Sequence, residues 1–172
     1  MTRGAIGTRN FNLVLQQLIN PASSDKAEVF RAGMTFRVGD RVIQLKNDYK
    51  REVFNGDLGM VAAIDSVEQE VIIRFEGREI SYDYADLNEI TLAWSITIHK
   101  SQGSEYPVVL LPIYMAHYVM LSRNLIYTGL TRAKKLAIVI GSHQAIAMAI
   151  KQVNQQERYT RLKERLESKR IF

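Results

Sequence analysis

Polar and charged residues gather in one short stretch, TIHKSQGSEYP at residues 97–107, which would make a poor core helix and a poor strand. Four of its side chains can donate hydrogen bonds to phosphate oxygens: Thr97, Lys100, Ser101 and Ser104. Gly103 lets the backbone approach a ligand closely, Glu105 can accept from a ribose hydroxyl, and His99 can stack on a base. The same residue types also make ordinary turns, so composition leaves a ligand-binding loop and a solvent-exposed capping loop both open.

A second polar stretch, YTGLTRAKK at residues 127–135, precedes an apolar run. Within it, Arg132 stands between Thr131 and Ala133, whose small side chains leave its planar guanidinium accessible. An arginine in such a place suits bidentate recognition of a phosphate or of transition-state charge. Spacing alone also allows a surface ion pair, which is the more common role of an arginine.

Other kinds of site find little support in the sequence. The chain has no cysteine, and its histidines, His99, His117 and His143, are widely separated. We therefore expect no metal site and no thiol nucleophile, and no persuasive Ser-His-Asp set is present.

The segments before residue 97 predict a helix followed by a small barrel. Residues 10–19 place apolar side chains at the spacing of an amphipathic helix, which Asn20-Pro21 ends: Phe11, Val14, Leu15 and Leu18. Between about Phe36 and Ala93, five short runs are rich in branched and aromatic residues: VIQL, MVAAI, VIIRF, ISYDY and EITLA. Asn55-Gly56 and Glu76-Gly77 suit tight turns, so this region predicts an antiparallel barrel.

The segments after residue 97 predict alternating strands and helices. VVLLP and LAIVIG are continuous apolar runs typical of buried parallel strands, with a helix expected over 119–133 between them. SHQAIAMAIKQV predicts a second helix, with Ser142 as its N-cap. Because a sheet of two strands is too small to stand alone, we expect the opening helix to pack on the same sheet, which makes the barrel an insertion.

Composition indicates a globular protein of the reducing cytoplasm. Of the 172 residues, 47% are hydrophobic, which is enough for a core, and no disulfide supports the fold. No leader pattern opens the chain, and no run approaches the roughly 20 apolar residues that span a bilayer. The net charge of +5 lies mostly in residues 151–172, which hold seven Lys or Arg and three Glu. That tail suits either a solvated charged helix or a phosphate-binding one.

Longer motifs connect the two polar stretches. TIHKSQGSEYPVVLLP resembles motif V, and LIYTGLTRAKKLAIVIG resembles motif VI, of superfamily-one DNA helicases of the RecD/TraA type, which include the exodeoxyribonuclease V alpha subunit. RGAIGTRNFNLVLQQLINP is similar to the segment that follows motif IV in that family. FRVGDRVIQLKNDYKREVFNGDLGMV is similar to the start of its domain 2B. The resemblance runs from Arg3 to about Val153.

This resemblance implies an α/β fold, in which a partial RecA-like parallel sheet lobe carries an inserted antiparallel β-barrel of the Src-homology-three type and a C-terminal helix. Residues 1–35 and 93–153 would form the RecA-like domain 2A, residues 36–92 the barrel domain 2B, and residues 154–172 a basic helical tail.

The resemblance also implies roles for individual residues. Three would contact single-stranded DNA: Thr97, His99 and Lys100. Three would lie at ATP, the last as the arginine finger that reaches the γ-phosphate: Gly103, Glu105 and Arg132. Four would support these motifs: Gln102, Tyr127, Thr128 and Thr131. Arg3 stands where motif IV places an arginine.

The barrel loop NDYKREVFNG, residues 47–56, is a further candidate DNA contact. Lys50 and Arg51 can pair with phosphates, while Tyr49 or Phe54 can stack on a base. The alternative is that Phe54 plugs the barrel and the charges are solvated.

The family pattern is incomplete in this sequence. No G-x-x-x-x-G-K-[ST] phosphate loop and no acidic magnesium motif are present, so the first lobe and the strand before RGAIG are absent. We expect the C-terminal portion of an ATP-dependent 5′-to-3′ helicase of DNA repair and recombination. It would use ATP and Mg²⁺ only together with an N-terminal lobe and would be inactive alone. A non-enzymatic module that binds single-stranded nucleic acid is the alternative.

Overall fold

The computed structural model describes Gly4 and residues 6–152, which form two compact units that divide between Glu105 and Tyr106. Arg3 and the predicted helical tail at residues 154–172 lie outside the described residues. Each unit is described separately below.

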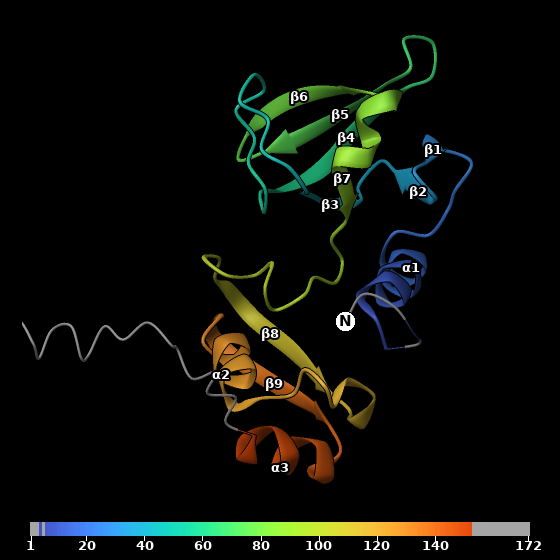
Figure 1. Cartoon of the computed structure of the whole chain (residues 1–172). Helices are drawn as coiled ribbons and strands as arrows, with labels where there is room; N and C mark the ends of the chain where they lie inside the picture. Colours follow the sequence, from blue (N-terminus) through green and yellow to red (C-terminus); the bar gives the residue numbers. More distant parts are fainter. Residues whose placement is uncertain (1–3, 5, 153–172) are drawn as a thin grey trace, which may run out of the picture. The chain divides into compact units, whose positions relative to one another are not determined.

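The first unit begins with a helix and continues as a β-barrel (Figure 1). Helix α1 spans Thr8–Ile19. A hairpin follows, made of β1 (Glu28–Arg31) and β2 (Met34–Arg37). The remaining strands form an antiparallel sheet in the order β6-β5-β4-β3-β7: β3 (Arg41–Gln44), β4 (Leu58–Asp65), β5 (Glu70–Phe75), β6 (Arg78–Asp83) and β7 (Ile90–Leu92). These strands confirm the five predicted ones, and a 3₁₀ turn, η1 (Tyr84–Glu89), closes the barrel before β7.

The hairpin of β5 and β6 shows how turn residues set the register. Phe75 pairs with Arg78, so Glu76 and Gly77 form a two-residue turn. Their φ angles are 42° and 87°, both in the left-handed region that this tight hairpin turn requires. The predicted turn at Glu76-Gly77 is therefore confirmed.

The barrel core includes residues from outside the predicted barrel segment. Val29 of β1 packs in the same buried cluster as Phe36 of β2, Val42 of β3 and Tyr82 of β6. The family resemblance places residues 1–35 in the RecA-like domain 2A, and this boundary stays a prediction. The β1–β2 hairpin packs with the barrel, because Val29 and Phe36 supply its apolar filling.

Helix α1 buries its polar face within the first unit. The buried positions are Asn12, Gln16 and the following Asn20, whereas Val14 is 46% exposed and Leu18 is 74% exposed. Within the first unit, the polar face of α1 is therefore the packing face, and the predicted packing of its apolar stripe on the parallel sheet stays a prediction. The physical reason is a buried acid that recruits the polar face.

That acid is Asp40, which is fully buried between β2 and β3. Its carboxylate accepts from Gln16 Nε2 at 2.5 Å, Asn20 Nδ2 at 2.8 Å and Trp94 Nε1 at 3.2 Å. It also accepts from the backbone N–H of Arg37 at 2.7 Å. A buried carboxylate is costly unless its oxygens accept several hydrogen bonds. The Asp40 carboxylate thus joins α1, the hairpin and the segment after β7 through hydrogen bonds.

The second unit is a strand-helix-strand-helix unit, as predicted. Parallel strands β8 (Tyr106–Ile113) and β9 (Ala133–Gly141) are joined through a 3₁₀ turn, η2 (Met115–His117), and helix α2 (Arg123–Leu130). Helix α3 (His143–Lys151) follows β9, and the predicted N-cap is confirmed because the Ser142 hydroxyl accepts from Ala145 N–H at 3.2 Å. Helix α2 is shorter than the predicted 119–133, since Ser122 caps its start and β9 begins at Ala133.

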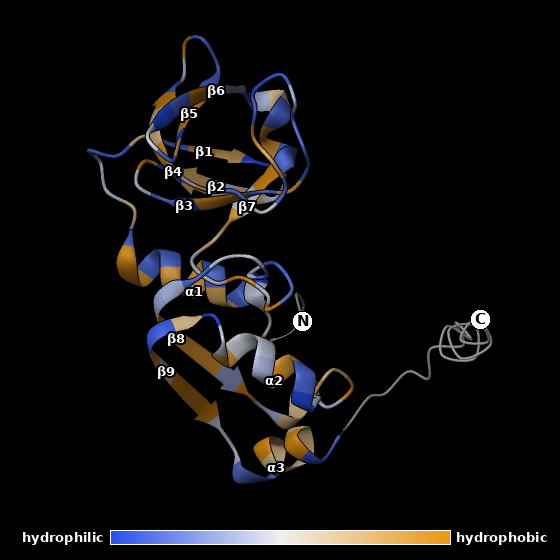
Figure 2. Cartoon of the chain, turned by 90° about the vertical axis from the view of Figure 1, so that its left-hand side faces the viewer, coloured by the Kyte–Doolittle hydropathy of each residue, from blue (hydrophilic) through white to orange (hydrophobic). Residues whose placement is uncertain are grey.

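Strands β8 and β9 consist largely of hydrophobic residues (Figure 2). Leu111 and Ile113 are buried, whereas Leu110 is 62% exposed and Ile140 is 46% exposed. Parallel strands of this composition are normally covered on both faces. The described part of the second unit therefore leaves apolar sheet surface open. None of the described helices is both long enough and apolar enough to cross a membrane.

We predict that Asp40→Ala lowers the free energy of unfolding of the first unit by about 3 kcal/mol. The substitution leaves the Trp94 indole N–H and the Arg37 backbone N–H buried without their acceptor, and it removes one acceptor each from Gln16 and Asn20. Urea unfolding followed by circular dichroism measures the change. The exposed Asp25→Ala is the matched control and should stay within about 0.5 kcal/mol of the parent. Equal stability of the two variants would contradict the role given to Asp40.

Candidate functional site

The stretch at residues 97–105 is a compact turn held by its own hydrogen bonds. Ser101 N–H donates to Thr97 O at 3.1 Å, and Lys100 N–H donates to Thr97 Oγ1 at 3.3 Å. The Ser101 hydroxyl donates to Ile98 O at 2.7 Å and is buried. Ser101 therefore holds the turn, and its hydroxyl proton is not available for the phosphate contact that its residue type suggested.

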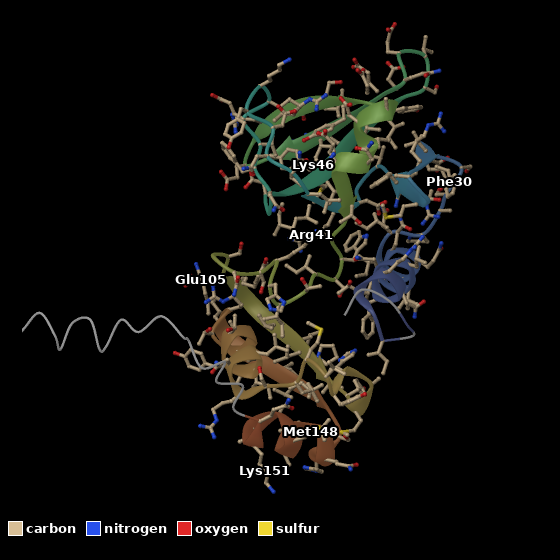
Figure 3. All side chains as sticks on the ribbon, viewed as in Figure 1. Phe30, Arg41, Lys46, Glu105, Met148 and Lys151 are labelled. Carbon is tan, nitrogen blue, oxygen red and sulfur yellow. The ribbon has the colours of Figure 1, made fainter. Side chains whose placement is uncertain are left out.

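The other predicted residues of this turn differ in exposure. His99, Gln102, Gly103 and Glu105 are exposed, whereas Thr97 and Lys100 are half-buried. Gly103 has a φ of +85°, which favours glycine at that position. Burial lowers the pKa of the Lys100 ammonium, because removing water from a charge disfavours the charged form. Figure 3 shows Glu105 where the turn leads into β8.

Helix α1 clamps the segment that enters the turn. The Asn12 amide donates to Leu92 O and to Ser95 O, both at 3.0 Å, and its oxygen accepts from Ser95 N–H at 2.7 Å. Asn12 therefore fixes the backbone two residues before Thr97. Sequence reasoning missed this function, although the signal was present in three amide residues spaced four apart on one helix face: Asn12, Gln16 and Asn20.

Arg132 lies at the end of α2, where neighbouring groups hold its guanidinium. Its Nε donates to Thr128 O at 3.2 Å, and its Nη2 lies 3.4 Å from Thr131 Oγ1. The Thr131 hydroxyl in turn donates to Thr128 O at 3.1 Å. Thr128 and Thr131 thus orient the arginine, while Tyr127 is largely exposed. The turn at 97–105 belongs to the first unit and Arg132 to the second, so their joint site stays a prediction.

The barrel loop between β3 and β4 is an ordered hairpin. Asp48 and Val53 form an isolated antiparallel bridge, and the Asp48 carboxylate accepts from the N–H groups of Lys50 and Arg51 at 2.9 and 3.1 Å. Tyr49 is 77% exposed and meets Phe54 edge to face, with ring centres 6.0 Å apart. Val53, and not Phe54, is the loop residue that fills the barrel. The alternative in which Phe54 plugs the barrel is therefore wrong.

The Arg51 side chain is half-buried and paired with neighbouring carboxylates, whereas Lys50 is exposed. Arg51 forms ion pairs with Asp48 at 2.9 Å, with Glu89 at 3.6 Å and with Asp86, and its guanidinium lies 4.6 Å from the centre of the Tyr82 ring. Burial raises the pKa of Tyr82 to about 12, and its hydroxyl donates to Gln44 Oε1 at 3.0 Å. Three carboxylates therefore already compete for the charge of Arg51, and its predicted DNA contact stays a prediction.

We predict that Arg51→Ala lowers the free energy of unfolding by about 2 kcal/mol, because it leaves a group of carboxylates without their cation. Lys50→Ala, which removes an exposed charge from the adjacent position, is the control and should change it by less than about 0.5 kcal/mol. Urea unfolding at neutral pH compares the two. A greater loss from Lys50→Ala would contradict the structural role of Arg51.

The same comparison has a defined pH dependence. The backbone N–H of Arg51 is the main cause that holds the pKa of Asp48 below its ordinary value, and the Arg51 charge adds to it. A carboxyl group with a lowered folded-state pKa contributes stability above its ordinary pKa and loses it as the pH falls through the folded-state value. The stability difference between the parent and Arg51→Ala should therefore shrink below about pH 4. A difference that stays constant down to acid unfolding would contradict the Asp48 contribution.

Two known domain families match the chain in succession. The SH3 domain of ATP-dependent RecD-like DNA helicases matches residues 11–75, and the UvrD-like helicase C-terminal domain matches residues 92–140. The first match covers α1, the β1–β2 hairpin and most of the barrel. The second begins at the end of β7 and includes both polar stretches.

Individual relatives agree with these domains. The ATP-dependent RecD2 DNA helicase of Deinococcus radiodurans is 40% identical over 167 residues, which are 96% of this chain and 22% of that protein. The RecBCD enzyme subunit RecD of Mycolicibacterium smegmatis is 29% identical, over 95% of this chain and 28% of its own length. The chain thus spans less than a third of the length of these curated relatives.

Solved structures show the same fold. The Pif1 helicase from Bacteroides, in a crystal structure with ADP-AlF3 and ssDNA, aligns with a TM-score of 0.60 at 19% identity, over 94% of this chain and 43% of that one. A second Pif1 structure, at forked dsDNA, aligns with a TM-score of 0.56 at 22% identity, over 77% of this chain and 37% of that one. In sequence, the chain is therefore similar to RecD-like DNA helicases, over the part that holds their SH3 domain and the UvrD-like C-terminal domain.

Proposed function

We propose that this chain supplies the DNA-binding turn and the arginine finger of an ATP-dependent 5′-to-3′ DNA helicase. The observation that carries the proposal is that hydrogen bonds already hold the polar side chains of both stretches in place. The turn at 97–105 is internally hydrogen-bonded and presents His99 and Glu105, while Arg132 is oriented by Thr128 and Thr131. Rigid loops with oriented polar groups are what binding and coupling require.

On the DNA side we assign Thr97, His99 and Lys100. The half-buried Lys100 contributes a charge that a phosphate can neutralise, and the exposed His99 ring offers a stacking surface. The Bacteroides Pif1 relative was crystallised with ssDNA, which supports single-stranded DNA as the ligand class.

On the nucleotide side we assign Gly103, Glu105 and Arg132. ATP is the substrate that matches this set, with Glu105 accepting from the ribose and Arg132 stabilising charge on the γ-phosphate. Gln102 and Tyr127 belong to the same motifs as supporting residues. The described residues hold no group of three His, Asp or Glu side chains that could bind a metal ion. We therefore assign no residue of this chain to the Mg²⁺ that accompanies ATP.

The partner that completes the site is an N-terminal helicase lobe, in the same polypeptide or in another chain. Two findings support this assignment. The chain corresponds to 22% of the Deinococcus relative, and the β8–β9 sheet leaves apolar residues such as Leu110 exposed. Alone, the chain is therefore proposed to have no helicase or ATPase activity.

We predict that replacing the matching region of the Deinococcus RecD2 helicase with this chain gives a DNA-stimulated ATPase, whereas the 172-residue chain alone gives none. In the chimera, Arg132→Ala should lower kcat by about 10³-fold, as for arginine fingers in phosphoryl transfer. Arg123→Ala, an exposed arginine at the start of α2, is the control and should leave kcat within about twofold. Full ATPase activity of the Arg132 variant, or turnover by the isolated chain, would contradict the proposal.

One observation favours a second function, a non-enzymatic module that binds single-stranded nucleic acid. The barrel loop presents the exposed pair Tyr49 and Phe54 beside the exposed cation Lys50. Aromatic rings with nearby positive charge are a common platform for unpaired bases. Such a module would hold DNA for a partner protein. It would give no ATPase activity even when it is joined to a first helicase lobe, so the chimera distinguishes the two functions.

We predict that an oligothymidine shifts the backbone NMR signals of residues 47–56. Tyr49→Ala should weaken binding because a base loses its stacking partner. Lys50→Gln should lower the salt dependence, as the slope of log K against log salt, by about 0.7. Arg74→Gln, an exposed barrel cation paired with Glu79 outside this loop, is the control for charge. Unchanged signals across the loop at saturating DNA would remove the barrel loop from the binding surface.

A further inference from the structure

The first unit contains a pocket of about 290 Å³ at the entry to the 97–105 turn. It is lined by helix α1, the β1–β2 hairpin, strands β3 and β7 and the start of the 97–105 turn, with Arg9, Leu13, Met34, Ile43, Leu92 and Lys100 among its residues. Thr97 and Lys100 are therefore part of a concave site. The size lies at the lower end of ligand pockets, about 300–1,000 Å³, so the pocket suits one small flat group.

The pocket has an apolar floor. Ile43 and Leu92 are each 1% exposed, and Met34 is partly buried against the barrel core. The polar side chains of Asn12 and Thr91 at this floor already have hydrogen-bond partners. Asn12 bonds to Leu92 and Ser95 through both its donors and its oxygen, and the Thr91 hydroxyl contacts Met34 Sδ at 3.4 Å. The interior therefore favours a group that binds through its faces and not through hydrogen bonds.

The rim of the pocket is positively charged. Arg9 and Lys100 contribute two cations, and no lining residue is an aspartate or glutamate. The Arg9 guanidinium lies against the β1–β2 turn, with Nη2 3.7 Å from where a Cβ on Gly33 would be. Among the described residues, no ion pair joins either cation to a carboxylate. Burial disfavours the charged form of Lys100, so a nearby anion would stabilise its charge.

An apolar floor beneath two rim cations matches one chemical class, a flat aromatic ring joined to an anion. We propose that the pocket takes one nucleotide of single-stranded DNA, with the base on Met34, Ile43 and Leu92 and its phosphate between Arg9 and Lys100. The proposal rests on DNA binding by the 97–105 turn and extends it to α1 and the β1–β2 hairpin. Arg9, Leu13 and Met34, which no motif singled out, become specificity residues for an inserted base.

The pocket walls are held in place by the same hydrogen bonds that join α1 to the barrel. Asn12 holds the backbone of Leu92 and Ser95, both in the pocket wall, and Asp40 holds the same helix through Gln16. The pocket is thus built from elements that the buried polar network already fixes. Its shape is preorganised, which reduces the ordering cost of binding.

Methyl NMR of the full chain, titrated with a short oligothymidine and with an abasic oligomer of equal length, tests the proposal. The oligothymidine should shift the Met34, Ile43 and Leu13 methyl signals. The abasic oligomer keeps the phosphates but lacks bases, so it should leave the Met34 signal in place. Equal Met34 shifts with both oligomers, or none with either, would overturn base insertion.

Substitutions at the rim separate the phosphate contact from general charge. Arg9→Gln and Lys100→Gln should each weaken oligothymidine binding and lower the slope of log K against log salt by about 0.7. Arg74→Gln, which removes one charge from an exposed pair with Glu79 on the barrel, is the matched control and should keep the parent slope. Identical slopes for Arg9→Gln and Arg74→Gln would overturn the phosphate assignment.

Leu13→Trp, at a half-exposed position of the pocket wall, should fill the space and remove the Met34 shift while the salt slope stays unchanged. Circular dichroism checks that each variant is folded.

If the parent binds oligothymidine and the pocket variants bind it equally well, the DNA-binding function stands and the pocket proposal falls. If the parent binds no oligothymidine, both fall. Saturable binding of free thymidine monophosphate with an unchanged oligomer affinity would assign the pocket to a free nucleotide instead and overturn the proposal.

Discussion

The first unit depends on the burial of one carboxylate. Asp40 is fully enclosed, and a charge in that position is tolerated only because four donors converge on it. Those donors come from α1, from the end of the β1–β2 hairpin and from Trp94 after the barrel. A single electrostatic requirement thereby connects segments that lie far apart in the sequence. The 97–105 turn inherits its position from this connection, because it begins three residues after Trp94.

This requirement also explains why α1 is oriented with its amide face inward. Satisfying Asp40 and the backbone around Ser95 outweighs burial of Val14 and Leu18, which stay exposed in the first unit. The second unit likewise keeps apolar side chains of β8 and β9 accessible. The chain corresponds to 22% of the length of its Deinococcus relative.

Cations of similar appearance in the sequence have different functions in the structure. Arg51 and Lys50 are adjacent, yet Arg51 forms ion pairs with three carboxylates while Lys50 is exposed. Arg9 sits on a helix that its sequence marks only as amphipathic, and the fold brings it to the same pocket as Lys100. Charge alone therefore does not identify a phosphate contact. Whether carboxylates lie close to a cation decides whether that cation is available to contact a phosphate.

Local patterns in the sequence were sufficient for the elements and the motif positions. Branched and aromatic runs predicted β3 to β7, the Glu76-Gly77 pair predicted its turn, and Ser142 predicted a helix start, because each depends on near neighbours. The ligand roles of residues 97–105 and 127–135 come from the motif resemblance and stay predictions. Tertiary structure alone decided that Val29 joins the barrel core, that α1 buries amides, and that Arg9 and Lys100 line one pocket. These features depend on contacts between distant residues and on the burial of Asp40, which no local periodicity encodes.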